Sequence, residues 1–302
     1  MRLFPILLCL TFLQTLNASM PRDILKESKN ILFLGDSITQ RGTYVSYFES
    51  WLVNQFPDLR FEIINAGLGS ETVSGLSEEG HAKGKFPRPC IFERLERVLA
   101  KTHPDLIIAC YGMNCGIYLE LDEERFDQYR HGLMRLRAVA KQYGAEVIHV
   151  TPPIYDNKGK RGFDYDDVLS AYSSWLVEQR EQGWLVADLH SEMRAKVDFL
   201  KDENPRFTVQ KDKVHPNDQG HWMMAESLFA YFGKEGAAPL NSVDDLVTPN
   251  QFQAIHQRMQ TFQKAIHAET KPLRPGVPMG GDLETARDVA KQLESAIYLT
   301  DQ

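Results

Sequence analysis

Residues 31–39 have the sequence ILFLGDSIT. The four consecutive apolar residues 31–34 are typical of a strand buried on both faces of a parallel sheet. The run ends at Gly35, and a small hydroxyl side chain, Ser37, follows two positions later. Because α/β sheets bind their ligands at the carboxyl ends of the strands, Ser37 is a candidate site residue. Gly-Asp-Ser is also a common turn sequence, so this interpretation depends on partner residues elsewhere in the chain.

Strand and helix patterns alternate along the chain after this stretch. Further strands are predicted at 61–65, 105–110, 145–150 and 184–188. Helices are predicted at 43–56, 91–100, 122–143, 166–182, from about 191, and at 217–231. This alternation indicates a parallel sheet wrapped by helices, with right-handed crossovers between strands. The predicted fold is therefore α/β: a three-layer α/β/α flavodoxin-like sandwich with about five parallel strands.

The two ends of the chain differ from this alternating region. Residues 1–19 combine a basic start, an apolar run and small residues, which is typical of a secretory signal peptide and predicts a secreted or periplasmic protein. A buried N-terminal helix is the alternative. Residues 240–302 show helical patterns at 249–269 and 283–299 and no strand pattern, so they are predicted to form a helical C-terminal extension. This extension packs on the sheet, covers the site or mediates oligomerisation; the sequence leaves the oligomeric state open.

Composition narrows the range of partners. A net charge of -7 and a pI near 5.8 argue against nucleic-acid binding and against a stable anionic-membrane partner. If Cys9 leaves with the signal peptide, three cysteines remain, so at most one disulfide could form, between Cys90 and either Cys110 or Cys115. Simple buried thiols are the expected state. No Cys/His spacing is typical of zinc, and no metal or cofactor is expected.

Polar residues occur at the predicted strand ends and before the last helix of the α/β region. Ser37 follows the first strand and Asn114 follows the third. Asp212 and His215 are three residues apart, a spacing that puts both side chains on one side of a turn or helix start. Nucleophilic acyl transfer needs such a hydroxyl, a base, an acid that orients the base, and neutral donors for the oxyanion. Asp36 is not the expected acid, because neighbouring side chains on an extended segment diverge.

In these residues the chain resembles the SGNH hydrolases, also called the GDSL esterase/lipase family. The four sequence blocks of that family have counterparts in order: GDS at 35–37, NAGLGSET at 65–72, GMN at 112–114 and DKVHP at 212–216. The resemblance covers about residues 30–232 and implies a hydrolase domain at 28–233. It implies Ser37 as the nucleophile, His215 as general base and then acid, and Asp212 as its orienting partner. It further implies an oxyanion hole made of the Ser37 N–H, a backbone N–H of Gly69 or Ser70, and the Asn114 side chain.

Two departures from the family pattern concern the oxyanion hole. The second block commonly has glycine directly before an acidic or polar residue, whereas here Ser70 precedes Glu71 and Gly69 is one position earlier. A backbone N–H can serve in either case, so both residues remain candidates. The third block usually continues with Asp, where this chain has Cys115. Catalysis is expected to survive that change, although the support of Asn114 is expected to differ.

The segment 78–84, with the sequence EEGHAKG, follows the second block. It is expected to be a solvated loop, with His81 lining the cleft as the alternative. Glu78 and Glu79 are not expected to act as a glycosidase pair, because adjacent residues do not flank one bond from two sides.

These observations predict a secreted serine esterase that works through an acyl-enzyme. A signal peptide, an acidic chain and the absence of a long apolar lid favour a small acyl group on carbohydrate, so an O-acetylesterase acting on acetylated carbohydrate is the first expectation. A lysophospholipase or thioesterase-type acyl hydrolase with the same triad is the first alternative. The second is a catalytically silent glycan-binding module that keeps the fold.

Overall fold

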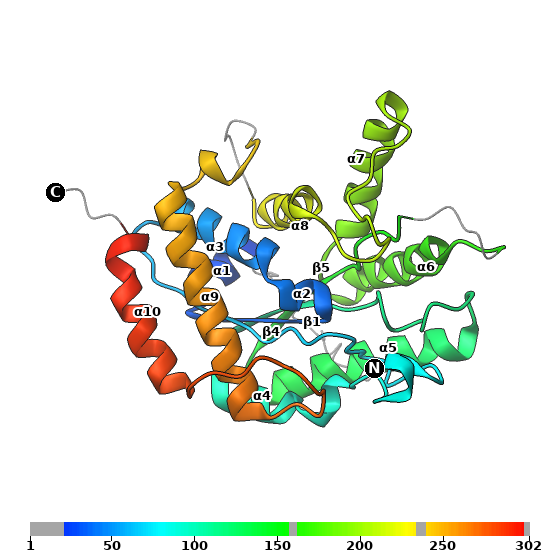
Figure 1. Cartoon of the computed structure of the whole chain (residues 1–302), viewed down its shortest axis with the longest axis horizontal. Coiled ribbons are helices and arrows are strands. Elements are labelled where there is room, and N and C mark those ends of the chain that lie inside the picture. The colour runs from blue at the N-terminus through cyan, green and yellow to red at the C-terminus, as the bar shows by residue number, and fades with distance from the viewer. Residues whose placement is uncertain (1–20, 157–161, 234–239, 299–302) are drawn as a thin grey trace, which may run out of the picture.

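A five-stranded parallel sheet forms the centre of the computed structural model, which describes residues 21–156, 162–233 and 240–298 (Figure 1). The strands are β1 (Asn30–Gly35), β2 (Glu62–Asn65), β3 (Leu106–Cys110), β4 (Glu146–Val150) and β5 (Leu185–Ala187). They pair in the order β2-β1-β3-β4-β5, which is a flavodoxin-like strand order. The predicted fold class is confirmed. The predicted signal peptide, residues 1–19, lies outside the described residues.

The interior strand β1 is buried as its sequence predicts. Side chains Ile31 to Leu34 are all at most 1% exposed, because β1 has a strand on either side and helices on both faces. The register pairs Gly35 with Cys110 of β3, and Cys110 with Val150 of β4. The carboxyl ends of the central strands therefore end at one level, and the residues that follow them meet at one edge of the sheet.

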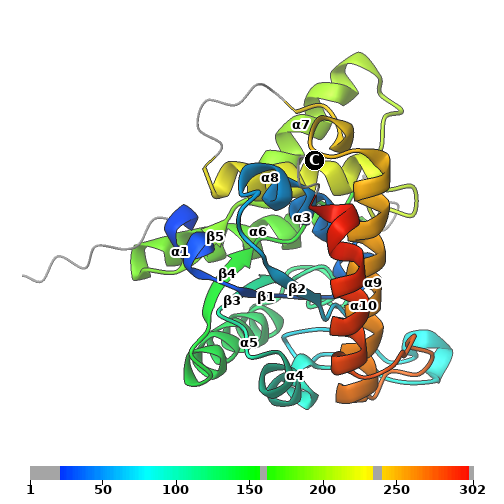
Figure 2. The same ribbon diagram turned by 90° about the vertical axis from the view of Figure 1, so that its left-hand side faces the viewer.

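Helices cover both faces of the sheet (Figure 2). The helices are α1 (Pro21–Glu27), α2 (Ser37–Arg41), α3 (Thr43–Gln55), α4 (Leu95–Thr102), α5 (Glu123–Gln142), α6 (Tyr165–Glu178), α7 (Leu189–Glu203), α8 (Asp218–Tyr231), α9 (Pro249–Thr270) and α10 (Leu283–Ile297). Helices α3 and α8 pack together on one face, and α4 and α5 cover the other. Helix α6 packs against α5 through stacked rings of Tyr129 and Tyr172, whose centroids are 4.3 Å apart. The short α1 and α2 were not predicted.

The C-terminal helices are part of the same fold. Helix α9 lies beside the edge strand β2 and against α3, and α10 packs on α9 (Figure 2). Arg258 of α9 forms a buried ion pair with Glu49 of α3, with Nε 2.7 Å from Oε1. An edge strand covered by a helix cannot pair with another chain, so α9 also protects the sheet. Of the three expected roles for this segment, packing on the sheet is the one that the structure shows directly.

Candidate active site

Ser37 begins the short helix α2 directly after β1 (Figure 1). Asp36 precedes it as the N-cap, and its Oδ1 accepts a hydrogen bond from the Ile38 N–H at 2.9 Å. The strand-to-helix turn therefore fixes Ser37 at the carboxyl edge of the sheet. Asp36 itself points into the fold and is only 3% exposed. The His215 Nδ1 is paired with Asp212 and not with Asp36, in agreement with the prediction that Asp36 is not the orienting acid.

Asp212 and His215 lie in a tight turn just before α8. Asp212 Oδ1 accepts hydrogen bonds from the backbone N–H groups of Val214 at 3.1 Å and His215 at 2.7 Å. Lys213 between them takes a left-handed conformation with φ of 77°. Partial burial acts to raise the pKa of Asp212, but the hydrogen bonds from His215 and Val214 outweigh it and hold this pKa below its usual value. The turn thus keeps the Asp212 carboxylate charged beside the imidazole.

The structure brings Ser37, His215 and Asp212 into one hydrogen-bonded chain. Ser37 Oγ lies 2.8 Å from His215 Nε2, and His215 Nδ1 lies 2.6 Å from Asp212 Oδ2. Ser37 and His215 are 178 positions apart in the sequence, so this contact is made by the fold alone. A hydroxyl that can pass its proton to an imidazole, which is held in one tautomer by a carboxylate, is the arrangement that nucleophilic acyl transfer needs.

Burial changes the charge behaviour of Asp36. Desolvation raises its pKa to about 6, against the opposing effect of the Ile38 hydrogen bond and of His215. In the unfolded chain Asp36 ionises near pH 3.8, whereas in the folded protein it keeps its proton up to about pH 6. Stability from this residue falls as pH rises through that window, because the unfolded state then binds fewer protons than the folded state.

We therefore expect Asp36→Asn to gain stability relative to wild type as pH rises from about 4 to about 6. Asparagine is as good an N-cap and carries no charge, so the gain approaches about 2–3 kcal/mol above this window. Urea unfolding of both proteins at several pH values measures the difference. If the difference in unfolding free energy between the two proteins did not change with pH, a raised pKa of Asp36 would be contradicted.

The second block places Gly69 and Ser70 beside α2. The Gly69 N–H already donates to Gln40 Oε1 at 2.7 Å. Ser70 takes a left-handed conformation with φ of 68°, and no acceptor for its backbone N–H is found among the described residues. Of the two candidate donors for an oxyanion, the Ser70 N–H is therefore the one that remains available.

Asn114 is oriented by residues that the sequence did not indicate. Its Oδ1 accepts hydrogen bonds from Arg88 Nη1 at 2.8 Å and from Tyr118 Oη at 3.1 Å. Both donors fix the amide with its NH₂ group on the other side, where Nδ2 lies 3.4 Å from the Glu71 carbonyl oxygen. Arg88 is in turn held by Glu78, with 2.6 Å from Nε to Oε2 and from Nη2 to Oε1. The side-chain oxygen of Asn114 is thus supported by an arginine and a tyrosine.

The backbone before Tyr118 explains how that side chain reaches Asn114. Ile117 and Tyr118 both take left-handed conformations, with φ of 48° and 57°. Such a conformation is costly for a β-branched residue and persists only where the surrounding structure enforces it. No propensity rule predicts two such residues in succession, so the sequence could not place Tyr118 in the site.

Cys115 is fully buried where the family pattern has Asp. Burial raises its pKa to about 12, so the thiol is neutral, and its Sγ accepts a hydrogen bond from the Val73 N–H at 3.5 Å. Cys110 is also a buried free thiol, and Cys90 is a half-buried one. Buried thiols are thus found for two of the three cysteines in the described part of the chain.

Side chains of the loop of residues 74–90 make several contacts with one another. Glu78 binds both Arg88 and His81, with 3.1 Å between His81 Nδ1 and Glu78 Oε1. The His81 ring packs edge-on against Phe86, with 5.5 Å between ring centroids. Residues 79, 80, 83 and 84 are exposed, as expected of a solvated loop, and His81 itself is held by Glu78 and Phe86.

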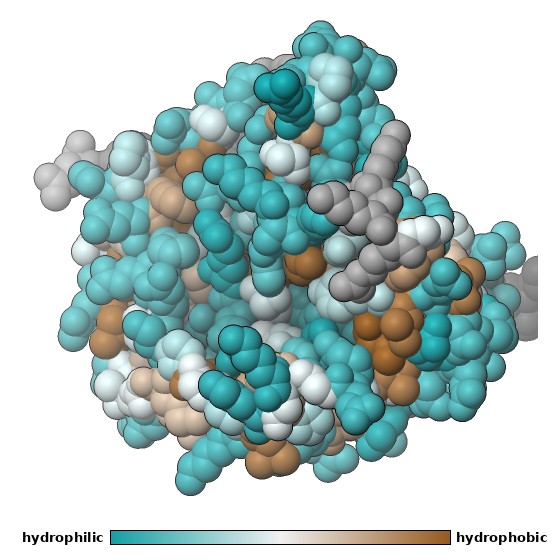
Figure 3. Space-filling model, turned by 45° about the vertical axis from the view of Figure 1, so that its right-hand side comes forward, coloured by the Kyte–Doolittle hydropathy of each residue, from teal (hydrophilic) through white to brown (hydrophobic). Residues whose placement is uncertain are grey.

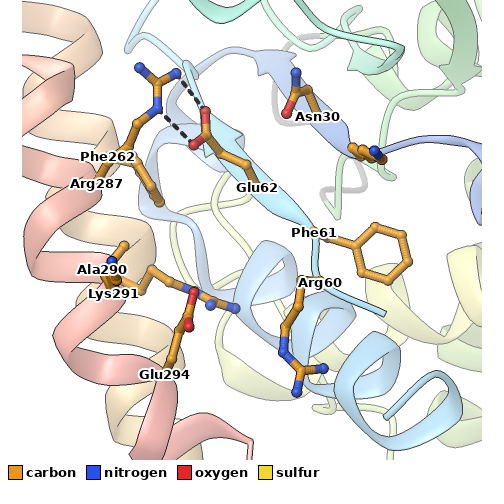
Figure 4. Close-up of a pocket in the computed structure, with 11 residues that line it drawn as sticks. Asn30, Arg60, Phe61, Glu62, Phe262, Arg287, Ala290, Lys291 and Glu294 are labelled. Carbon is orange, nitrogen blue, oxygen red and sulfur yellow. Dashed lines mark hydrogen bonds and ion pairs between the residues drawn. The ribbon is translucent and has the colours of Figure 1, made fainter. Parts of the chain in front are cut away.

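A separate cavity of about 360 Å³ lies at the opposite end of the sheet (Figure 4). It is lined by Lys29, Asn30, Arg60, Phe61, Glu62, Arg258, Phe262, Arg287, Ala290, Lys291 and Glu294. Arg287 makes two 2.8 Å hydrogen bonds to Glu62 there, as Figure 4 shows. None of the predicted site residues lines this cavity, which lies at the amino-terminal ends of β1 and β2. It is a junction between α10 and the sheet.

Within residues 21–156, 162–233 and 240–298, no group of three or more His, Cys, Asp or Glu side chains is arranged to hold a metal ion. In the same part of the chain, every helix is too short or too polar to cross a bilayer.

The fold and this site define a class of protein: a flavodoxin-like hydrolase whose serine follows the first strand. A model of the GDSL-like lipase/acylhydrolase family matches residues 33–223 of the 302. The chain therefore belongs to this family, and it is a carboxylic ester hydrolase. No curated protein sequence matches the chain.

Solved structures of enzymes share the fold at low sequence identity. The acetylxylan esterase Axe2 from Geobacillus stearothermophilus is 22% identical with a TM-score of 0.53; the match covers 70% of this chain and 97% of Axe2. A gut microbial diltiazem-metabolizing enzyme is 21% identical with a TM-score of 0.57. That match covers 68% of this chain but only 47% of the other, so this chain spans about half of that enzyme's length. At this identity these similarities concern the fold.

Proposed function

We propose that this protein is an exported serine O-acetylesterase acting on carbohydrate. The observation that carries the proposal is the chain of hydrogen bonds from Ser37 through His215 to Asp212, with distances of 2.8 and 2.6 Å. Export is supported by the signal-peptide pattern of residues 1–19.

In the proposed reaction Ser37 Oγ attacks the ester carbonyl while its proton passes to His215 Nε2. Asp212 stabilises the imidazolium that forms and holds the Nδ1–H tautomer. The tetrahedral intermediate collapses when His215 donates the proton to the leaving sugar oxygen, which leaves an acetyl group on Ser37. His215 then removes a proton from water, and the water oxygen attacks the acyl-enzyme. The bond between the acetyl group and Ser37 Oγ breaks, His215 returns the proton to Oγ, and acetate is released.

The proposed oxyanion hole consists of three donors: the N–H groups of Ser37 and Ser70 and the Asn114 Nδ2. Arg88 and Tyr118 hold the Asn114 amide by its Oδ1, so the NH₂ group faces away from them. One of its two N–H donors bonds to the Glu71 carbonyl oxygen, and the second is left for the oxyanion. A donor fixed before the reaction needs no reorganisation when the negative charge develops. Arg88 also places a positive charge behind this amide, which strengthens its N–H groups as donors.

Asn114→Ala is expected to lower kcat by about 10²–10³ with a smaller change in KM, because an oxyanion donor acts mainly in the transition state. The measurement is steady-state hydrolysis of p-nitrophenyl acetate. Asn204→Ala, at the end of α7, is the matched control and should retain wild-type kinetics. A near-wild-type kcat in Asn114→Ala would remove this side chain from the site.

The scattered distribution of hydrophobic residues on the surface supports a substrate with a small acyl group. Figure 3 shows a mainly hydrophilic face on which hydrophobic residues occur in separate patches. The exposed large hydrophobic residues belong to several different segments: Leu119, Leu121, Met134, Tyr143, Phe199, Leu273 and Met279. A long acyl chain would need a continuous apolar groove to leave water.

Chain-length preference tests the proposed substrate class. We expect p-nitrophenyl acetate to be hydrolysed much faster than the palmitate ester, and acetate to be released from acetylated polysaccharides such as acetylated xylan. A preference for the palmitate ester or for lysophospholipid would favour the alternative acyl hydrolase. Binding of glycans without turnover of any ester would instead favour the silent module.

A further inference from the structure

Arg274, from the C-terminal segment, lies beside Gly69, the residue that precedes the proposed Ser70 donor. It belongs to the loop of residues 271–282 between α9 and α10, which lies beside the loop of residues 74–90 (Figures 1 and 2). The Arg274 guanidinium lies 5.7 Å from the centroid of the Phe86 ring. Its Nε and Nη2 are both 3.0 Å from the position that a Cβ on Gly69 would occupy. The guanidinium is thus adjacent to the segment that carries the proposed Ser70 donor.

The Arg274 guanidinium can take this position because Gly69 has no side chain. A Cβ there would meet the Arg274 guanidinium at 3.0 Å and Gln40 Oε1 at 2.9 Å, both closer than ordinary contacts. Helix α9 is also joined to α2 here, because Gln263 Nε2 of α9 donates to the carbonyl oxygen of Gln40 in α2 at 2.7 Å. The C-terminal segment therefore contributes to the active-site rim and is more than an outer layer.

The guanidinium has no carboxylate partner within the described part of the chain. Its Nε is buried without a hydrogen-bond partner, and Nη1 donates only to the Pro275 carbonyl oxygen at 3.2 Å. Arg88 and Arg94, which also lie near the site, are each paired with a glutamate, at 2.6 and 2.7 Å. A buried donor without an acceptor is costly, and a ligand that supplies the acceptor relieves that cost.

We propose that Arg274 is a specificity-determining residue that binds an anionic group of the substrate, a carboxylate or a sulfate, next to the acetyl ester. This inference rests on the proposed function and names the substrate class as an acetylated acidic glycan. A guanidinium presents a planar pair of N–H donors that matches both anions. A cavity of about 480 Å³, lined by residues 77–81 and 84–87, adjoins it at Phe86 and has room for a neighbouring sugar.

Paired substrates test this assignment. One pair is acetylated oligogalacturonide with free carboxylates and the same oligomer with methyl-esterified carboxylates. The other is an acetylated, sulfated oligosaccharide and its desulfated form. Wild type is expected to show about 10-fold to 100-fold higher kcat/KM for the charged member of at least one pair, which also identifies the anion. Arg274→Gln should abolish this preference and leave hydrolysis of p-nitrophenyl acetate unchanged within about twofold.

Lys291→Gln on α10 is the matched control, because it removes one positive charge far from Ser37 and should keep the preference. Arg274→Lys keeps the positive charge but lacks the planar pair of donors, so it should retain only part of the preference for the charged substrate. Equal activity on both members of each pair, or a preference that survives in Arg274→Gln, would overturn the assignment.

Acetate release from neutral acetylated xylo-oligosaccharides is measured in parallel. If wild type released no acetate from any of these oligosaccharides, the proposed function would be contradicted, whatever the role of Arg274. Inhibition of p-nitrophenyl acetate hydrolysis by unacetylated, charged oligomers is also expected, and it should be about 10-fold weaker in Arg274→Gln.

Discussion

Replacing Ser37 by alanine is expected to lower kcat for p-nitrophenyl acetate by about 10⁴–10⁶. The alanine variant keeps the Ser37 N–H and the imidazole but has no oxygen to form the acyl-enzyme. Its fold should be unchanged, because Asp36 and not the serine side chain caps α2. The measurement is steady-state hydrolysis with enough enzyme to detect the residual rate.

Two comparisons make this result specific. Ser191→Ala, on the surface at the start of α7, should retain wild-type activity. His215→Ala should cause a loss similar to that in Ser37→Ala, and the double variant should be no worse than either, because residues that act as a unit are not additive. Additive losses in the double variant would mean that the two side chains do not act in one step.

Arg258→Met is expected to destabilise the whole protein by about 3–5 kcal/mol. Arg258 is the buried partner of Glu49, which is 1% exposed. Both of its hydrogen bonds to Glu49 go to Oε1, and Oε2 has no hydrogen-bond partner among the described residues. Without the guanidinium the carboxyl group is left in an apolar environment, where desolvation already raises its pKa and only Arg258 opposes that effect. Urea unfolding, followed by fluorescence and by circular dichroism, measures the loss.

Arg287→Met is the matched control for that variant. It removes an exposed contact from α10 to Glu62, which should cost at most about 1 kcal/mol. The double variant Glu49→Leu/Arg258→Met should recover most of the stability, because it leaves no unpaired buried charge. Unfolding of Arg258→Met in two separate steps, with the α/β region unaffected, would show that α9 and α10 form an independent unit.

Much of the α/β region could be predicted because its signals are local. The apolar run of β1 identifies a strand buried on both faces, and alternating strands and helices imply parallel crossovers. The position of Ser37 follows from that topology, since carboxyl strand ends share one edge of the sheet, whereas His215 lies in the turn before α8. The resemblance to the family added the roles of these residues.

The supports of the site could not be predicted, because they depend on long-range contacts and unusual backbone conformations. Arg88 meets Asn114 from 26 positions away, through a loop with no regular pattern. Tyr118 needs two successive left-handed residues to reach the same amide. For α9 and α10, helical periodicity indicates that one face is buried but not which surface covers it, so neither the Glu49 pair nor Arg274 could be foreseen.

Covalent labelling tests the central claim most directly. An aryl fluorophosphonate that reacts with activated serine hydroxyls should add a single phosphonyl group to the protein and abolish esterase activity, and peptide mapping by mass spectrometry should locate it on Ser37. The Ser37→Ala variant should remain unlabelled. Labelling at another residue with loss of activity, or undiminished labelling of Ser37→Ala, would contradict Ser37 as the nucleophile.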